Sequence, residues 1–143
     1  MQDDRLRTSL GNAVARLFRL VNRAHGRALK PHDVSTEQAH ILSILWIEGP
    51  LTIGRLQRML ALSSPTLTGA LDRMESSGLV RRVPSPDDRR VSLIEPRVPA
   101  KQRAKIEATI DASEVQLFAA LTQPERKELL RLLDKCITDL DAQ

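Results

Sequence analysis

The stretch SSPTLTGALDRMESSGLVRRVPSPDDRRVSL, residues 63–93, decides the fold, because it predicts a helix followed at once by two short strands. Ser64 can cap the helix, and Pro65 fits the first helical position, where its missing N–H donor costs no hydrogen bond. Gly78 is a typical residue to end the helix. One face of this helix is apolar and is expected to pack inward, and it carries Leu67, Ala70, Leu71 and Met74.

Residues 79–83 and 90–94 are β-prone segments with a turn sequence between them. Pro84 and Pro86 are unfavourable inside a helix or a central strand. The aspartates and arginines beside these prolines are therefore expected at an exposed tip. Together, the segments predict a two-stranded hairpin directly after the helix.

Two further helices are predicted before this stretch. Ser35 and Gln38 fit a capping box, and Gly49 is a suitable end for the first of these helices. Thr52 fits the N-cap of a second, short helix. Their inward faces are expected to carry Ile41, Leu42, Leu45 and Trp46 in the first helix and Ile53, Leu56, Met59 and Leu60 in the second.

Long amphipathic helices are predicted at both ends of the chain. The first ends before Pro31, and after the hairpin Pro99 can open another that runs to Leu121. Thr122 and Glu125 fit a capping box for the last helix. Apolar residues recur on the first helix at Leu6, Leu10, Val14, Leu17 and Val21, and on the last at Leu129, Leu133, Cys136 and Leu140. Because such faces are too apolar for solitary helices, we expect these two helices to bury each other, with a second subunit as a further partner.

Composition limits the class of protein. The 143 residues suffice for one domain with its own core. Lys and Arg number 22 against 18 Asp and Glu, and this net charge of +4 favours an anionic partner. A single cysteine excludes an intramolecular disulfide and agrees with a reducing compartment. Because no apolar run reaches membrane-spanning length and the start does not resemble a signal peptide, we expect a cytoplasmic protein without a membrane partner.

Two short helices joined by a tight turn and followed by a hairpin predict a winged helix-turn-helix, whose second helix enters the DNA major groove. Hydroxyl groups at the start of that helix can bond phosphates or base edges, and arginines can bond phosphates. For the hydroxyl groups taken alone, an ordinary solvated surface helix is the alternative. The candidate DNA-binding residues are Ser63, Ser64, Thr66, Thr68, Arg73, Arg81, Arg82, Asp88, Arg89 and Arg90.

Asp88 and Arg90 stand two residues apart near the hairpin tip. If the chain is extended there, both side chains project from one face and the carboxylate holds the guanidinium in a fixed direction. Such an arginine suits the minor groove, whose negative potential attracts a cation without base-specific bonds. The alternative is a charged edge that prevents strand-to-strand aggregation.

With these features the chain resembles the MarR family of bacterial transcription regulators, most strongly over residues 34–93. The motifs LDRMESSGLVRR (residues 71–82) and PDDRRV (residues 86–91) look like the end of the family's recognition helix and its wing. The resemblance implies a homodimer held by the terminal helices. It also implies binding to a pseudo-palindromic operator, usually as a repressor released by a small ligand or by oxidation.

Two places depart from the family pattern. Gly69 stands where the family often has a long polar or basic side chain, which weakens the prediction of base-specific contacts. The sequence EPRVP, residues 95–99, replaces the family's usual Leu-Thr start of the next helix. We therefore expect a stiffer or differently angled link between the wing and the dimerisation helix.

Other chemistry has little support in the sequence. Cys136 lies on an apolar stripe, which is an unsuitable setting for a reactive thiol, so we expect no redox sensing. His25, His32 and His40 match no compact metal-ligand spacing, and no metal site is expected. Because no nucleophile with its base, paired carboxylates or Gly-rich phosphate loop occurs in a recognisable context, we expect neither enzymatic activity nor a cofactor.

The first helix carries arginines at spacings of three and four, and no acidic residue occurs between Arg5 and Lys30. A solvated charged face is the favoured interpretation. The alternative is that some of these arginines rim a cleft for an anionic effector, such as an aromatic carboxylate or an acyl-coenzyme A. The candidate effector-binding residues are Arg16, Phe18, Arg19, Arg23 and Trp46.

We therefore predict a mostly α protein with a small β-hairpin wing. Residues 35–96 form the winged helix-turn-helix lobe, and residues 1–34 and 97–143 form dimerisation helices. The predicted function is sequence-specific binding of double-stranded DNA by a homodimeric repressor that a small anionic or aromatic effector releases. The alternative is a winged-helix module that binds an acidic protein surface.

Overall fold

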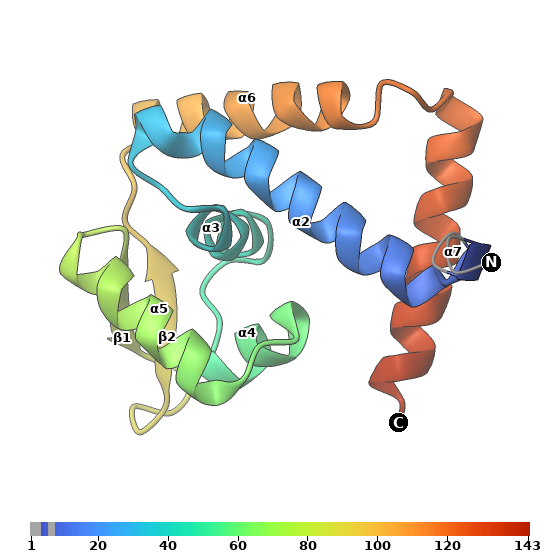
Figure 1. Ribbon diagram of the computed structural model, residues 1–143. Coiled ribbons are helices and arrows are strands. Elements are labelled where there is room, and N and C mark those ends of the chain that lie inside the picture. Colours follow the sequence, from blue (N-terminus) through green and yellow to red (C-terminus); the bar gives the residue numbers. More distant parts are fainter. Residues whose placement is uncertain (1–3, 6–7) are drawn as a thin grey trace.

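The predicted order of helices and strands is confirmed by the computed structural model, which describes residues 4, 5 and 8–143 (Figure 1). Leu6, predicted on the first apolar face, lies outside the described residues. None of the helices in the described ranges is both long and apolar enough to cross a membrane. The elements are α2 Leu10–Leu29, the 3-10 turn η1 Lys30–His32, α3 Thr36–Glu48, α4 Ile53–Leu60, α5 Ser64–Ser76, β1 Val80–Pro84, β2 Ser92–Pro96, α6 Ala100–Leu117 and α7 Gln123–Asp141.

Polar caps define the starts of most helices. Both predicted capping boxes, at the starts of α3 and α7, are confirmed, and Thr52 caps α4 as expected. The predicted cap of α5 is wrong by one residue. Ser63 has the extended backbone of an N-cap and accepts a hydrogen bond from the Thr66 amide, so Ser64 is the first helical residue and Pro65 the second.

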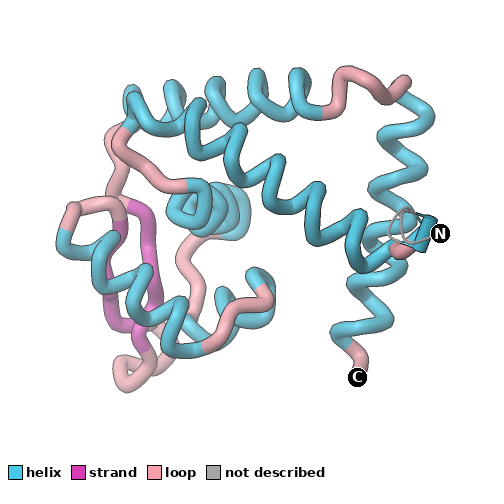
Figure 2. Tube along the Cα trace, viewed as in Figure 1, coloured by secondary structure: helices cyan, strands magenta, loops and turns pink. Residues whose placement is uncertain are grey.

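The hairpin pairs β1 with β2 in antiparallel register, from Val80 opposite Pro96 to Pro84 opposite Ser92 (Figure 2). The strands begin one and two residues later than predicted. β2 starts only after Val91, whose amide donates to the Asp88 carbonyl within the tip. A short bridge between Leu51 and Ile94 adds a third segment beside β2 and joins the hairpin to the start of α4.

One hydrophobic core lies under the helices α3, α4 and α5 and the hairpin. The four predicted inward residues of α5 are buried, as are Leu42, Leu56 and Ile94. The prediction for Met59 is wrong, because this side chain is exposed. On a helical wheel Ile53 and Leu60 flank Leu56 on one side and Met59 lies on the other, so this two-turn helix turns Met59 away from the core.

The long helices pack differently from the prediction. α2 packs along α6, and the 3-10 turn that follows α2 contacts α6 as well, through His32, whose Nε2 lies 2.8 Å from the Thr109 hydroxyl. α6 ends at Leu117, four residues before the predicted end. α7 lies at the opposite end of the molecule from the hairpin and buries no residue (Figure 1). The expected mutual burial of the first and last helices is therefore wrong within a single chain.

Candidate DNA-binding site

The start of α5 presents a group of hydroxyl side chains to solvent. Ser63, Ser64, Thr66 and Thr68 are all exposed. The hydroxyls of Ser63 and Thr66 lie 2.8 Å apart and bond each other, so part of their hydrogen-bonding capacity is used in capping the helix. Pro65 has no N–H group and the Thr66 N–H bonds Ser63, so it is mainly the positive end of the helix dipole that favours a phosphate there.

Arg73 lies on the same helix, one turn after Gly69. A Cβ atom at Gly69 would come within 3.4 Å of the Arg73 guanidinium, so the arginine lies close over the glycine backbone. The departure from the family pattern at Gly69 thus coincides with the path of a long basic side chain from the next turn. Spacing of four residues on a helix is the sequence signal that pairs these positions.

The wing tip contains the predicted pair of Asp88 and Arg90. The Arg90 guanidinium contacts both carboxylate oxygens of Asp88, at 3.1 and 3.2 Å, and the Arg90 amide donates to the same carboxylate at 3.1 Å. The contact is confirmed, but the extended backbone assumed for it is wrong, because these residues lie in a turn. The hydrogen bonds from Arg90 hold the pKa of Asp88 below its usual value, so the carboxylate stays charged.

Arg90 is nevertheless open to the surroundings, with 91% of its side chain exposed. Arg89 beside it is also exposed. The hairpin tip and the N-terminal end of α5 both lie at the lower edge of the lobe in Figure 1. An arginine whose direction is restrained while its charge remains accessible can enter a groove with little loss of side-chain freedom.

Arg82 has a different environment from the arginines of the tip. Its guanidinium contacts Asp72 at 2.8 Å and Glu75 at 3.2 Å, and its amide donates to Glu75 at 3.2 Å. The hydrogen bond to Asp72 raises the pKa of Arg82 further, and the side chain is only 28% exposed. Because both acids belong to α5, Arg82 ties the first strand of the wing to that helix.

Arg81 is paired as well. It faces Glu95 across the hairpin and forms an ion pair with it. Cross-strand pairs of opposite charge stabilise a two-stranded sheet by a few tenths of a kcal/mol up to about 1 kcal/mol. The predicted phosphate contacts of Arg81 and Arg82 remain predictions, and the structure adds an internal partner for each of these side chains.

A cleft of about 490 Å³ lies among α2, α3, α4 and α6. Phe18, Val21, Leu29, Leu60 and Ile110 supply much of its apolar lining. Polar residues also line it, including His25, Asn22, Glu37, His40 and Glu114. Burial lowers the pKa of His40, and Glu37 opposes this effect.

The comparisons with known proteins agree with this geometry. The profile described as "MarR family" matches residues 34–92. The HTH-type transcriptional regulator MgrA of Staphylococcus aureus is 32% identical over 124 residues, which cover 86% of this chain and 84% of MgrA. The chain belongs to the MarR family. The regulator TtmR of Methylorubrum extorquens (strain PA1) is 40% identical over 72 residues, 50% of this chain and 37% of TtmR.

Solved structures show the same fold. A MarR variant from E. coli, crystallised with operator DNA, superposes with a TM-score of 0.76 at 27% identity and covers 89% of this chain and 92% of its own. CouR from Rhodococcus jostii RHA1, bound to p-coumaroyl-CoA, has a TM-score of 0.80 at 21% identity, with 92% and 94% covered. As a MarR-family protein, this chain is a DNA-binding transcription regulator with a winged helix and is not an enzyme.

Of the predicted effector residues, only Phe18 is among those that line the cleft of this MarR-family protein. Arg16, Arg19 and Arg23 are exposed on α2 and are absent from the lining. Trp46 is half-buried against the core, with the Arg103 guanidinium 5.1 Å from the centre of its ring. The structure therefore places one predicted apolar residue, Phe18, at the cleft and leaves Trp46 and the three arginines outside its lining.

Sequence reasoning missed the ionisable groups of the cleft as a group. The spacing of His25 and His40 was compared only with metal-ligand patterns, and the described residues contain no cluster of three that could hold a metal ion. Glu114 lies far from these histidines in the sequence, so no spacing could have connected them.

Cys136 is exposed within the single chain.

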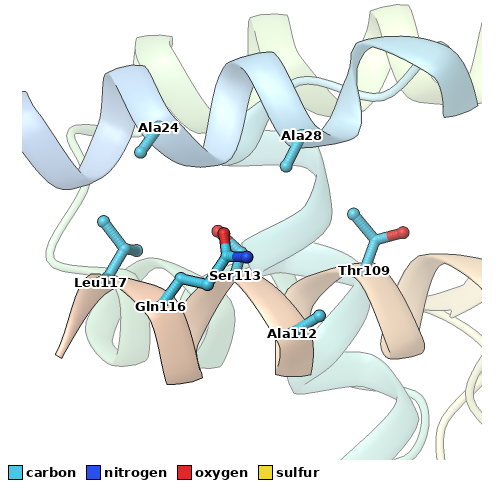
Figure 3. Close-up of a pocket in the computed structure, with 7 residues that line it drawn as sticks. All are labelled: Ala24, Ala28, Thr109, Ala112, Ser113, Gln116 and Leu117. Atoms are coloured by element: carbon cyan, nitrogen blue, oxygen red, sulfur yellow. The ribbon is translucent and has the colours of Figure 1, made fainter. Parts of the chain in front are cut away.

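A shallow groove also runs between α2 and α6 (Figure 3). Small side chains form much of its surface, and the close-up shows Ala24 and Ala28 on α2 facing Thr109, Ala112 and Ser113 on α6. Small residues let two helices approach closely, and this agrees with the packing of α2 along α6. The groove lacks a charged side chain among its lining residues, and we assign it no ligand.

Proposed function

We propose that this MarR-family protein is a homodimeric repressor that binds a pseudo-palindromic operator. The dimer is supported by the apolar side chains that a single chain leaves exposed on its long helices. These are Leu10, Val14, Leu17, Phe18 and Leu20 on α2 and Leu130, Leu132, Leu133, Ile137 and Leu140 on α7. So much exposed apolar surface on two helices is typical of an interface between subunits.

The observation that carries the DNA-binding mode is the wing tip, where Asp88 directs an almost fully exposed Arg90. In the proposed complex, α5 enters the major groove and Arg90 enters the neighbouring minor groove. The exposed hydroxyls at the start of α5 and the side chains of Arg73 and Arg89 contact phosphates or base edges there. Two such lobes related by a two-fold axis require half-sites about one helical turn apart.

Release by a small effector completes the proposal. The cleft is lined by residues of α2, which carries proposed dimer contacts, and of α6, which leads into α7. It is also lined by residues of α3 and α4 in the DNA-binding lobe. An effector that binds better to one relative position of these helices changes the spacing of the two recognition helices and lowers the operator affinity. The structure of CouR with p-coumaroyl-CoA is an example of a protein of this fold with a small molecule bound.

Selection of duplexes from a random pool by the purified protein tests the proposal. We expect a palindromic site to be enriched, and we expect Arg90→Ala to weaken binding to it by about 1 kcal/mol or more. Lys105→Ala is the matched control, because it removes one exposed positive charge from α6. This control should leave the affinity nearly unchanged.

Two results would contradict the proposed binding mode. Equal losses in Arg90→Ala and Lys105→Ala would show that only net charge matters and would remove the minor-groove role of Arg90. Failure to enrich any site, with weak binding to all duplexes, would favour an acidic protein partner instead. Repression is tested separately with a reporter gene downstream of the selected site, whose expression should fall when the protein is present.

A further inference from the structure

Among the Lys, Arg, Asp and Glu side chains, only acidic ones line the cleft within the described residues. Two carboxylates, of Glu37 and Glu114, are among the residues that line it, whereas no lysine or arginine is found among the described lining residues. Burial lowers the pKa of His40, which favours its neutral form. An anion in this cleft would meet like charge, and a cation would meet opposite charge.

The cleft also contains a polar atom without a partner. The Nε2 atom of His25 is buried and has no hydrogen-bond partner within the described part of the chain. A buried polar atom left without a hydrogen bond is unfavourable, so such an atom marks a place where a ligand group fits. A neutral imidazole nitrogen without its proton accepts a hydrogen bond from an N–H or O–H donor.

The remaining wall suits a flat ring. Phe18 lines the cleft together with aliphatic side chains of α2, α4 and α6, among them Val21, Leu60 and Ile110. The face of an aromatic ring attracts a cation, and aliphatic walls favour an apolar body. A volume of about 490 Å³ lies within the range of small-molecule sites.

We propose that this cleft binds an aromatic molecule that carries a protonated amine. The ring lies against Phe18 and the aliphatic wall, and the amine faces the carboxylates of Glu37 and Glu114 and donates to His25. This inference rests on the proposed function, because it names the chemical class of the effector for the same cleft. It reverses the charge expected from the arginines of the first helix, since those arginines do not line the cleft.

Three naphthalene compounds that differ mainly in charge test the inference. Titration calorimetry of the full chain near neutral pH would compare 2-naphthylmethylammonium, neutral 2-naphthol and anionic 2-naphthoate. We expect the cation to bind at least about tenfold more tightly than the anion, with the neutral compound between them. Equal or tighter binding of naphthoate, equal binding of naphthol and the cation, or no binding of any compound would overturn the inference.

Amide variants locate the charge that is recognised. Glu37→Gln and Glu114→Gln keep the side-chain shape, and each should weaken the cation several-fold while leaving naphthol nearly unchanged. Asp111→Asn is the matched control, because Asp111 is an exposed acid of α6 outside the lining. If all three variants weaken the cation equally, general surface charge explains the binding and the proposed site is wrong.

Operator binding by the same preparations separates this inference from the proposed function. A protein that binds its operator but not the naphthyl cation refutes the ligand class alone. Binding of the cation without any loss of operator affinity keeps the ligand class and refutes the effector role. The thermal unfolding temperature of each variant is measured without ligand. If it is unchanged, a lost calorimetric signal reflects lost ligand binding and not unfolding of the variant.

Discussion

The winged lobe and the last helix have opposite relations to the apolar surface of this chain. The lobe is built around one core, in which Leu42 and Ile94 are fully buried and to which Leu29 of α2 and Ile106 of α6 also contribute. α7 has an equally regular apolar stripe but buries none of its residues within the chain. The same pattern of leucines therefore stabilises the fold in one region and remains available for association in the other.

The arginines of the wing show the same contrast on a smaller scale. Arg82 is largely covered and tied to two acids of α5, whereas Arg90 is directed by one acid and remains exposed. A side chain with internal partners positions the elements that it joins. A side chain that one ion pair orients, but that stays exposed, remains available to a ligand.

Substitution of a leucine within the lobe should produce the largest effect on the stability of a single chain. Leu71→Ala leaves a cavity in a close-packed core, and we expect the free energy of unfolding to fall by about 2 to 5 kcal/mol. Urea denaturation should show this loss at every protein concentration. A loss that disappears at high protein concentration would show that Leu71 acts through association instead.

A charge introduced on α7 should impair the association of subunits and leave the fold of the single chain intact. Ile137→Asp places a carboxylate on the exposed apolar stripe, so we expect the subunits to separate and the operator affinity to fall about 100-fold. Analytical ultracentrifugation measures the oligomer, and circular dichroism should show that the helix content is kept. An intact dimer with normal operator affinity would contradict the assignment of this face.

Substitution of Asp72 distinguishes two possible roles of Arg82, because the two roles predict opposite changes in operator affinity. If Arg82 positions the wing, Asp72→Asn should weaken operator binding about tenfold, because the strand loses its connection to α5. If Arg82 acts only as a phosphate ligand, loss of a negative charge near DNA should strengthen binding. The operator affinity measured at several salt concentrations decides between these roles.

The salt dependence supplies the matched control. Arg82→Gln should lower the affinity without changing the slope of log K against log salt, because its charge is held by Asp72 and Glu75. Arg89→Ala removes an exposed arginine of the tip. The magnitude of the slope should fall by about one, which corresponds to the loss of one phosphate contact. Equal changes of slope in both variants would assign both arginines to the phosphates.

The smallest expected effect is a pH dependence from His40. Burial lowers its pKa in the folded state below the ordinary value of about 6.5. As the pH falls through this ordinary value, the unfolded chain binds a proton before the folded chain does, so the free energy of unfolding falls with the pH. His40→Gln should remove this part of the decrease, and thermal unfolding at several pH values measures it.

Much of the lobe was predictable because its signals are local. The capping residues Ser35 and Thr52, the apolar face of α5 and the Pro and Asp residues of the tip each act within a few positions of the chain. The pair of Asp88 and Arg90 was predictable for the same reason, although the turn that holds it was not. The errors at Ser64 and Met59 concern the exact start of a helix and which side of a two-turn helix faces inward, and local patterns determine these poorly.

By itself, the sequence determined the order of the elements, the winged fold and the position of the charged tip, because periodicity and turn chemistry depend on near neighbours. Only the tertiary structure decided that α2 packs along α6, that Arg82 joins α5, and that His25 and Glu114 share one cleft. These relations join residues far apart in the chain. They depend on how the helices pack in three dimensions, and no spacing along the sequence encodes such packing.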